Sequence, residues 1–335
     1  HGLPSGRPLH ISGQRCRDNV LTFNSKFYYR AAEQDGNSSL LRIHGAMFVK
    51  IWIDPAHPIS TPLYPFLPVR HEGKSLCVLC RTCMELYSES PCCHTTEEER
   101  SWKGHYTTAD LEYALRMGYK IIKIYETLAH FTLDYSLQKY FQHLAGKKCS
   151  AAFPTTTLQH GEVHTCQEQC KENACPHLDA FVREINECLS LLPLSPQSIF
   201  NNPAQRDYYK LIMNTVLGKF SQNNFEKTCT KLVQHAKETM SILEDEHLTV
   251  IGAKLLPESE VLMLQYQRKG GFEQLNRNYS CIIGAFITAH ARVVLHEAID
   301  LLDLKGCIVA YTDTDSILFL RCQLDKTPST FPKLK

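Results

Sequence analysis

Apolar and polar positions along the first half of the chain repeat with the periods of both strands and helices. Alternation with a period of two predicts strands, whereas apolar positions three or four residues apart predict helices. A threonine just before a periodic stretch further indicates a helix start. The elements predicted in this half are a strand within residues 39–54, a Pro-rich connection over 55–75, a helix over 107–118 that begins at Thr107 or Thr108, a strand over 119–126 and a helix over about 134–146.

The second half of the chain mixes the two periods more closely. Prolines separate its helical stretches, because a proline cannot continue a helix through its missing N–H group. Two neighbouring helices with a short connection would form an antiparallel hairpin. The elements predicted here are polar loops over 155–176, helices near 178–192 and 198–218 split by Pro193, Pro196 and Pro203, short strands over 226–266 with turns at 244–246 and 257–258, and, over the last 60 residues, a helix, a strand, an acidic turn and a strand.

The acidic turn carries two aspartates between apolar runs at 307–310 and 317–320. An ionised carboxylate away from water is costly unless it is paired or binds a metal. Period-two alternation puts Asp313 and Asp315 on one face of a hairpin, and Mg²⁺ prefers carboxylate oxygens and substrate phosphates. Asp-x-Asp alone also fits an ordinary acidic turn. The longer pattern Tyr-x-Asp-Thr-Asp-Ser favours a metal site.

A second candidate group lies on the predicted helix near 198–218. Arg206, Lys210, Asn214 and Gly218 recur every four residues, so they share one helix face. An arginine can grip phosphate with two hydrogen bonds, a lysine adds a point charge, and a glycine lets a base approach closely. A solvated amphipathic helix explains this segment equally well by itself. Together with the acidic pair, the segment favours triphosphate binding.

Composition narrows the class of protein. The chain has 335 residues, 43% hydrophobic and 21% charged, which is enough for a core and for two or more substructures. Its formal net charge of +1 gives no global basic signal, so affinity for DNA has to come from local grooves. No apolar run approaches the length of a membrane span and no secretory leader is present. We therefore expect an intracellular protein with no membrane partner.

The cysteines suggest metal binding rather than disulfides. Fifteen is a high and odd number for a chain without a leader, which argues against a disulfide framework. Cys80, Cys83 and His94, with Cys92 or Cys93, have the residue types and spacing of a structural zinc site. Zinc and buried free thiols explain this first cluster equally well. A second cluster is less regular and favours free thiols. It consists of His164, Cys166, Cys170, Cys175 and His177.

The two chemical motifs together resemble those of family B DNA polymerases. Residues 311–316 are similar to motif C, and residues 202–220 are similar to motif B, which reads Lys, three residues, Asn-Ser, one residue, Tyr or Trp, then Gly. Residues 283–302 resemble the helix before motif C in the protein-primed members. The order of four further segments is similar to that in the polymerases of Polinton (Maverick) transposons and related viruses. These segments are Leu79–Cys83, Cys92–His94, Glu97–Arg100 and 111–126.

This resemblance implies an α+β fold with a family B palm and fingers, a Cys-rich insertion and an incomplete right hand. Exonuclease motifs, motif A with its aspartate, and the thumb have no counterpart, so we expect a fragment of a longer gene product. Asp54 is too far from Leu63-Tyr64-Pro65 to replace motif A and is interpreted as a strand-end residue. The implied domains are palm at 1–60, a protein-primed-type insertion at 61–177 with its Cys-rich element at 77–94, fingers at 178–225, and palm at 226–335.

The implied activity is DNA-directed DNA polymerisation with two metal ions, Mg²⁺ being the cofactor and Zn²⁺ a structural ion of the insertion. The partners would be a DNA primer-template, a dNTP and a terminal protein primer, in the nucleus if the element is eukaryotic. The implied roles are catalysis and Mg²⁺ binding for Asp313 and Asp315, triphosphate binding for Arg206 and Lys210, and shaping of the nucleotide site for Asn214, Gly218 and Tyr311.

Three residues depart from the family pattern. Thr215 replaces a serine, Leu217 replaces an aromatic residue, and Thr312 replaces a small residue at the turn. By analogy with base stacking, the loss of an aromatic at 217 would cost about 1–3 kcal/mol. The missing motif A favours an alternative from another class for this chain. That alternative is a non-catalytic, zinc-stabilised DNA- or protein-binding remnant of a mobile element.

Overall fold

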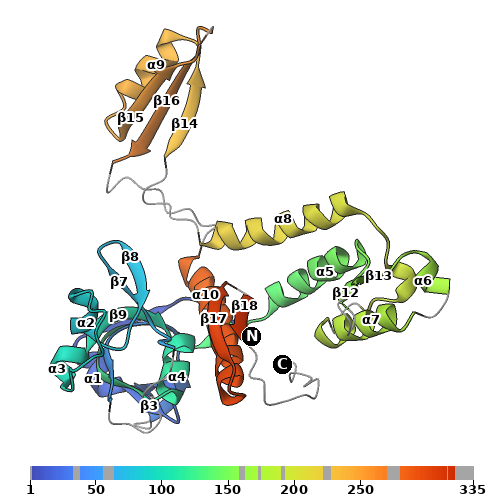
Figure 1. Ribbon diagram of the computed structural model, residues 1–335. Helices are drawn as coiled ribbons and strands as arrows, with labels where there is room; N and C mark the ends of the chain where they lie inside the picture. Colours follow the sequence, from blue (N-terminus) through green and yellow to red (C-terminus); the bar gives the residue numbers. More distant parts are fainter. Residues whose placement is uncertain are drawn as a thin grey trace. The chain divides into compact units, whose positions relative to one another are not determined.

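The computed structural model describes residues 2–32, 38–55, 64–157, 163–172, 175–189, 193–221, 228–257, 259–269, 280–314 and 316–320. The chain divides into two compact units, His1–Arg206 with Ala285–Lys335, and Asp207–Gly284. Both units contain helices and strands (Figure 1), so the predicted α+β class is confirmed.

The first unit is organised around an antiparallel four-stranded sheet. Its strands, in spatial order, are β2 (Leu9–Ser12), β10 (Tyr119–His130), β6 (His44–Ile53) and β9 (Trp102–Thr107). Buried residues alternate along the whole of β6, as the period of two predicted. A Cβ on Gly45 would lie 1.8 Å from the carbonyl oxygen of Leu128, so only glycine allows β6 and β10 to approach this closely.

Smaller elements surround this sheet and complete its apolar core. The core includes Phe27, Ile43 and Phe66, which are all fully buried. The surrounding helices are α1 (Gln14–Asn19), α2 (Arg81–Glu85), α3 (Glu97–Arg100) and α4 (Thr108–Arg116). The surrounding strands are β1 (Leu3–Ser5) with β11 (Thr132–Asp134), β3 (Val20–Phe23) with β4 (Lys26–Ala32) and β5 (Ser38–Arg42), and β7 (Pro68–His71) with β8 (Lys74–Cys77).

A helical lobe follows in the same unit. It contains α5 (Ser136–Ser150), β12 (Thr155–Thr157), β13 (Val163–Thr165), α6 (Gln169–Glu172), α7 (Pro176–Cys188) and the 3₁₀ turn η1 (Pro196–Ser198). The predicted helices at 134–146 and 178–192 are confirmed. The prediction of loops over 155–176 is wrong, because β12 pairs with β13 and α6 follows them. Short strands of three residues leave too little periodicity to detect in the sequence.

Helix α8 (Pro203–Phe220) crosses from the first unit into the second. It starts five residues later than predicted at 198, since Pro196 begins η1 and Pro203 occupies the first helical turn. The rest of the second unit is the sheet β14–β16–β15, made of β14 (Cys229–Val233), β15 (Leu248–Leu255) and β16 (Leu262–Arg268). Helix α9 (Ala236–Leu243) packs on it through Ile242, which contacts Val233 and Leu264 in a small core (Figure 1). The strands were predicted, whereas α9 was not.

The last described elements are α10 (Cys281–Leu304), β17 (Ile308–Asp313) and β18 (Ser316–Leu320), in the predicted order. By length and composition alone α10 could cross a membrane, so the prediction that no segment approaches a membrane span is wrong. Its side chains nevertheless pack in the first unit, where Phe286, Ala289 and Ile299 are buried.

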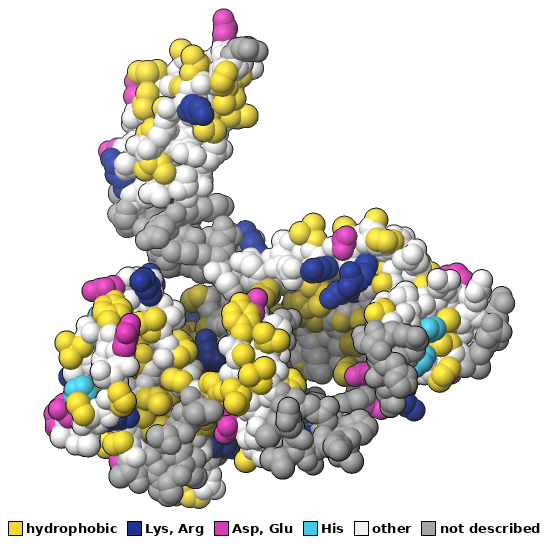
Figure 2. All heavy atoms as spheres, viewed as in Figure 1, with side chains coloured by type: hydrophobic (Ala, Val, Ile, Leu, Met, Phe, Trp, Pro, Cys, Tyr) yellow, Lys and Arg dark blue, Asp and Glu magenta, His cyan; other side chains and the backbone are white. Residues whose placement is uncertain are grey.

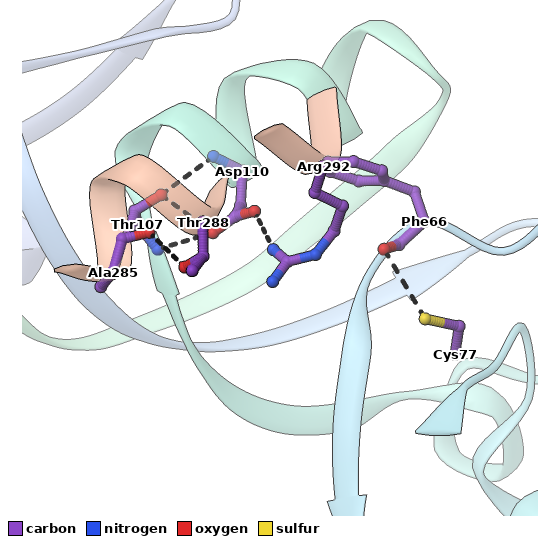
Figure 3. A network of polar contacts seen from close by, with 7 residues as sticks. All are labelled: Phe66, Cys77, Thr107, Asp110, Ala285, Thr288 and Arg292. Atoms are coloured by element: carbon purple, nitrogen blue, oxygen red, sulfur yellow. Dashed lines mark hydrogen bonds and ion pairs between the residues drawn. The ribbon is translucent and has the colours of Figure 1, made fainter. Parts of the chain in front are cut away.

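A buried polar network joins α10 to α4 (Figure 3). Thr107 caps α4, since its hydroxyl accepts from the Asp110 backbone N–H at 3.2 Å and donates to the Asp110 carboxylate at 2.9 Å. The second carboxylate oxygen of Asp110 accepts from Arg292 Nη1 on α10. Asp110 is only 4% exposed. The Asp110 carboxylate therefore helps to cap the start of α4 and also binds α10.

We expect Asp110→Ala to lower the free energy of unfolding of the first unit by about 3–5 kcal/mol, because it leaves the Arg292 charge without its partner. Urea denaturation followed by tryptophan fluorescence measures this unit selectively, since Trp52 and Trp102, the two tryptophans, both lie on its central sheet.

Glu297→Ala is the matched control for this substitution. Arg116 and Glu297 join the same two helices at 3.9 Å, but their side chains are 60% and 43% exposed. Losing an exposed pair costs less than about 1 kcal/mol. Equal losses in Asp110→Ala and Glu297→Ala would contradict the role given to the buried pair.

Candidate functional site

The acidic hairpin forms as the sequence predicted, with a tight turn. In the register of β17 and β18, Asp313 pairs with Ser316, so two residues make the turn. Asp313 is exposed at the end of β17, and its carboxylate accepts a hydrogen bond from the Thr314 hydroxyl at 3.0 Å. The Ser316 hydroxyl donates to the Asp313 carbonyl oxygen, also at 3.0 Å. Asp315 lies outside the described residues. The hairpin therefore presents the carboxylate of Asp313 to solvent at its tip.

Two details of this hairpin differ from the sequence analysis. Thr314 has a φ of +48°, which is a left-handed turn conformation and not an extended one. The period-two argument for a shared face of Asp313 and Asp315 therefore does not apply across the turn. Thr312 was expected in the crowded turn, but it pairs with Ile317 within the strands, where a β-branched side chain fits well.

A cavity of about 500 Å³ lies beside β17, and Tyr311 and Thr312 line it. Its other walls come from the segment around Tyr64, from Cys77 and from α10. The Tyr64 hydroxyl donates to the Val309 carbonyl oxygen at 3.4 Å, and His296 Nε2 lies 3.1 Å from the Tyr64 carbonyl oxygen. Tyr311 remains 61% exposed. The hairpin is thus held at its base while its tip is free.

The four residues predicted to share a helix face lie on α8 and are all exposed, Arg206 in the first unit and Lys210, Asn214 and Gly218 in the second. The partly buried residues of α8 lie between them, at positions such as Tyr209 and Met213. The predicted helix face therefore exists. Its role in binding a nucleotide stays a prediction.

Basic side chains also gather where α5 and the start of α8 lie (Figure 2). Lys139, His143 and Lys147 recur every four residues on α5 and are exposed. Burial raises the pKa of the Cys149 thiol, and the positive charges of Lys148 and Arg206 oppose that rise. A cavity of about 350 Å³ at this place is lined by His143, Lys147 and Gln205, among others. Phosphate groups would be attracted to this surface.

Asp54 directly follows β6, and its carboxylate accepts from Lys120 Nζ at 3.1 Å. Its interpretation as a strand-end residue is therefore confirmed. In the part of the chain that the structure describes, Asp313 belongs to no group of three or more metal-ligating side chains. The predicted Mg²⁺ site is not established by these residues.

The first Cys/His cluster converges as zinc would require. The Sγ atoms of Cys80, Cys83 and Cys92 lie 3.6, 3.4 and 3.7 Å from Nδ1 of His94. A tetrahedral zinc ion with ordinary bond lengths separates a sulfur and a nitrogen ligand by about 3.6 Å. Cys93 was the alternative to Cys92, and it is not part of this group of four. The four side chains could hold zinc, and we refer to them as the first tetrad.

The charges around the first tetrad also favour a cation. Burial opposes the ionisation of Cys92, but hydrogen bonds from His94 and Cys83 outweigh it and lower the pKa of Cys92 to about 7. Burial and the two neighbouring thiols raise the pKa of Cys83 to about 12. Three thiolates this close together are stable only if a positive ion neutralises them.

Arg100 contacts the first tetrad, although in the sequence it was noted only within the segment Glu97–Arg100 of the family resemblance. Its side chain is 5% exposed and donates to Cys92 Sγ at 3.3 Å and to the carbonyl oxygens of His94, Leu79 and Ile53 at 3.1 to 3.2 Å. Three thiolates, a neutral imidazole and Zn²⁺ carry a net charge of −1, which one guanidinium balances. The only available signal was an arginine shortly after the cysteines.

Comparisons with known proteins found one distant structural likeness. No protein-family model matches the chain, and no curated protein matches its sequence. The structure is similar to that of Phi29 DNA polymerase in an orthorhombic crystal form, with a TM-score of 0.42 and 14% sequence identity. The match covers 96% of this chain and 36% of that polymerase. At this distance the likeness does not assign a family.

We expect Arg100→Lys to weaken zinc binding at the first tetrad by about 10- to 100-fold, the usual effect of losing a residue that supports metal ligands. A lysine cannot reproduce the four hydrogen bonds of the guanidinium. Titration against a chromogenic zinc chelator measures the change. Arg81→Lys is the control, because Arg81 lies on α2 next to Cys80 and has a side chain 42% exposed. Among the described residues it bonds to the Glu98 carbonyl oxygen and pairs with the Glu85 carboxylate. Unchanged affinity in Arg100→Lys would refute the supporting role.

Proposed function

We propose that the chain is part of the polymerase region of a family B DNA polymerase of the protein-primed, Polinton-like type. The observation that carries this proposal is the acidic hairpin. Its strands hold the sequence Tyr-Thr-Asp-Thr-Asp-Ser in a two-residue turn that leaves the Asp313 carboxylate exposed at the tip. A carboxylate presented in this way has room for a metal ion and a substrate phosphate.

The reaction would be attack of a DNA 3′-hydroxyl, or of a protein hydroxyl at initiation, on the α-phosphate of a dNTP with release of pyrophosphate. Asp315 would be the main Mg²⁺ ligand and Asp313 the supporting one. Mg²⁺ at these residues would neutralise the phosphates and orient them. An aspartate of a motif A segment would complete the proposed pair of carboxylate sources.

The exposed face of α8 would serve the incoming nucleotide. Arg206 and Lys210 would bind the triphosphate, since positioning and charge stabilisation provide most of the rate in phosphoryl transfer. Asn214 and Gly218 would shape the nucleotide site together with Tyr311, which is exposed on β17. The basic residues at the start of α8 and on α5 support this assignment, because they concentrate positive charge in a chain whose net charge is only +1.

The proposed domain roles follow the sequence resemblance. Residues 1–60 and 226–335 would be palm, residues 178–225 fingers, and residues 61–177 an insertion that contacts a DNA primer-template or a terminal protein primer. The basic face of α5 and the first tetrad both belong to this insertion. Zinc would make its surface rigid before a partner binds.

A non-catalytic DNA- or protein-binding remnant of a mobile element is the alternative function. The observation in its favour is the first tetrad, where four ligands converge in a way that suits a structural zinc ion and requires no catalysis. Such a remnant would keep its zinc and its affinity for DNA without extending a primer.

We expect the full reading frame that contains this chain to extend a DNA primer with Mg²⁺, and Asp315→Asn and Asp313→Asn to reduce the rate about 100-fold or more. Removing charge stabilisation from a transferring phosphate has effects of this size. Primer extension under single-turnover conditions measures the rate, and filter binding of the primer-template measures DNA affinity separately.

Glu72→Gln is the matched control, because Glu72 is also an exposed acid at the turn of a two-stranded hairpin, β7–β8, with φ at +47°. This variant keeps the parental rate. If the folded protein binds DNA but neither the parent nor any variant extends the primer, the polymerase proposal is wrong and the remnant is favoured.

A further inference from the structure

The apolar cluster beside α7 in the helical lobe is small. It consists of the buried residues Cys166, Leu178, Val182 and Ile199, with Phe153 and Phe181 partly buried against them. The elements next to it are short, since β12 and β13 have three residues each and α6 has four. Small substructures of this kind usually need a disulfide or a metal ion, since they bury too little apolar surface. One of the four buried core residues is itself a cysteine with polar neighbours.

Four ligand atoms converge beside this core. His164 Nε2 lies 3.6 Å from Cys166 Sγ and 3.7 Å from Cys175 Sγ, and the two sulfurs are 3.8 Å apart. Cys170 Sγ completes a group of four whose atoms all lie within 4.8 Å of one another. Tetrahedral zinc would separate two sulfurs by about 3.8 Å and a sulfur from a nitrogen by about 3.6 Å. We refer to these residues as the second tetrad.

The backbone around the second tetrad is arranged for thiolates. The Gln167 N–H donates to Cys170 Sγ at 3.4 Å. Cys175 is the N-cap of α7, a helix of 13 residues, so its sulfur lies at the positive end of the helix dipole. This dipole and the Gln167 N–H stabilise negative charge on sulfur. A neutral thiol would gain little from either.

A disulfide does not explain the group. Two bonded sulfurs are about 2.05 Å apart, so the Cys166 and Cys175 sulfurs are too far apart for a bond. A disulfide between any two of the cysteines would also leave the third cysteine and His164 gathered without reason. His177, the fifth residue of the sequence cluster, has its ring centroid 4.9 Å from that of His164, with the two rings tilted by 42°, and is not one of the four. It lies where it can orient the His164 ring.

We propose that His164, Cys166, Cys170 and Cys175 form a second, structural zinc site that fixes the helical lobe. Three sulfurs and one imidazole nitrogen in a tetrahedron select Zn²⁺ among common divalent ions. All four positions are filled by protein atoms, so no place remains for a reacting water. The ion links β13, the turn after it, α6 and the start of α7. This proposal replaces the expectation from the sequence that the cysteines of this cluster are free thiols.

The zinc content of the full chain tests this proposal directly. Native mass spectrometry should find two zinc ions in the parent protein and one in Cys166→Ser and in Cys175→Ser. Cys170→His, which keeps a ligand of another type, should retain both ions. Cys188→Ser is the matched control, since Cys188 is an exposed cysteine at the end of the same helix α7 and lies outside the tetrad. It should also retain two.

Cobalt(II) provides a measurement that leaves the second tetrad intact. In Cys83→Ser protein, where the first tetrad is broken, bound cobalt should show the intense visible absorption of a tetrahedral site with thiolate ligands. Unchanged zinc content in Cys166→Ser, or the absence of this cobalt absorption in Cys83→Ser protein, would overturn the proposal. Neither result depends on polymerase activity, so the two proposals can fail separately.

Discussion

The ion pair of Asp110 with Arg292 is the constraint on which the candidate site depends. Asp110 accepts from the cap of α4 and from α10 at once, so its carboxylate links the local end of one helix to the position of another. Burial raises the pKa of this carboxyl, and the Arg292 charge opposes that rise. An unpaired charge here would be expensive, which makes the arrangement of the two helices specific.

The ion pair begins a polar seam along α10. His296 and Asp300 follow Arg292 at intervals of four residues, and Asp300 accepts from the Tyr113 hydroxyl of α4 at 2.7 Å. Helix α10 ends at Leu304, and Gly306, whose φ is +68°, then turns the chain into β17. The base of the acidic hairpin is therefore set by side-chain contacts of the helix that precedes it. Asp313 can stay exposed because contacts along α10, and not contacts of the hairpin tip, position the hairpin.

The features predicted correctly from sequence are those whose pattern lies within a few neighbouring residues. The start of α4 was predictable because Thr107 and Asp110 form a capping box within four residues. The hairpin was predictable from two apolar runs and a turn. Helix α9 was missed because eight residues between strands give little periodicity. The face of Asp315 could not be inferred by alternation, since alternation assumes extended backbone and Thr314 is not extended. The tertiary partners of Arg292 were beyond any local pattern.

The two tetrads differ in how far the spacing of their residues along the sequence could predict them. Cys80 and Cys83 have the familiar spacing for zinc, so the first cluster could be suggested from sequence. In the second, the pairing of β12 with β13 and the start of α7 bring His164 and Cys175 together, which spacing alone does not reveal. The first tetrad also needs Arg100, whose buried charge has no carboxylate among its hydrogen-bond partners and is balanced by sulfur.

Charge segregation connects these features to the proposed binding of DNA. A chain with a net charge of +1 attracts a polyanion only where its basic residues are separated from its acidic ones. Lys139, His143 and Lys147 achieve this on one face of α5, whose other face is partly buried through Leu144 and Gly146. A helix can present such a face only if its lobe is rigid, because a flexible lobe would lose entropy on binding. The small core and the second tetrad are therefore part of the same argument as the basic surface.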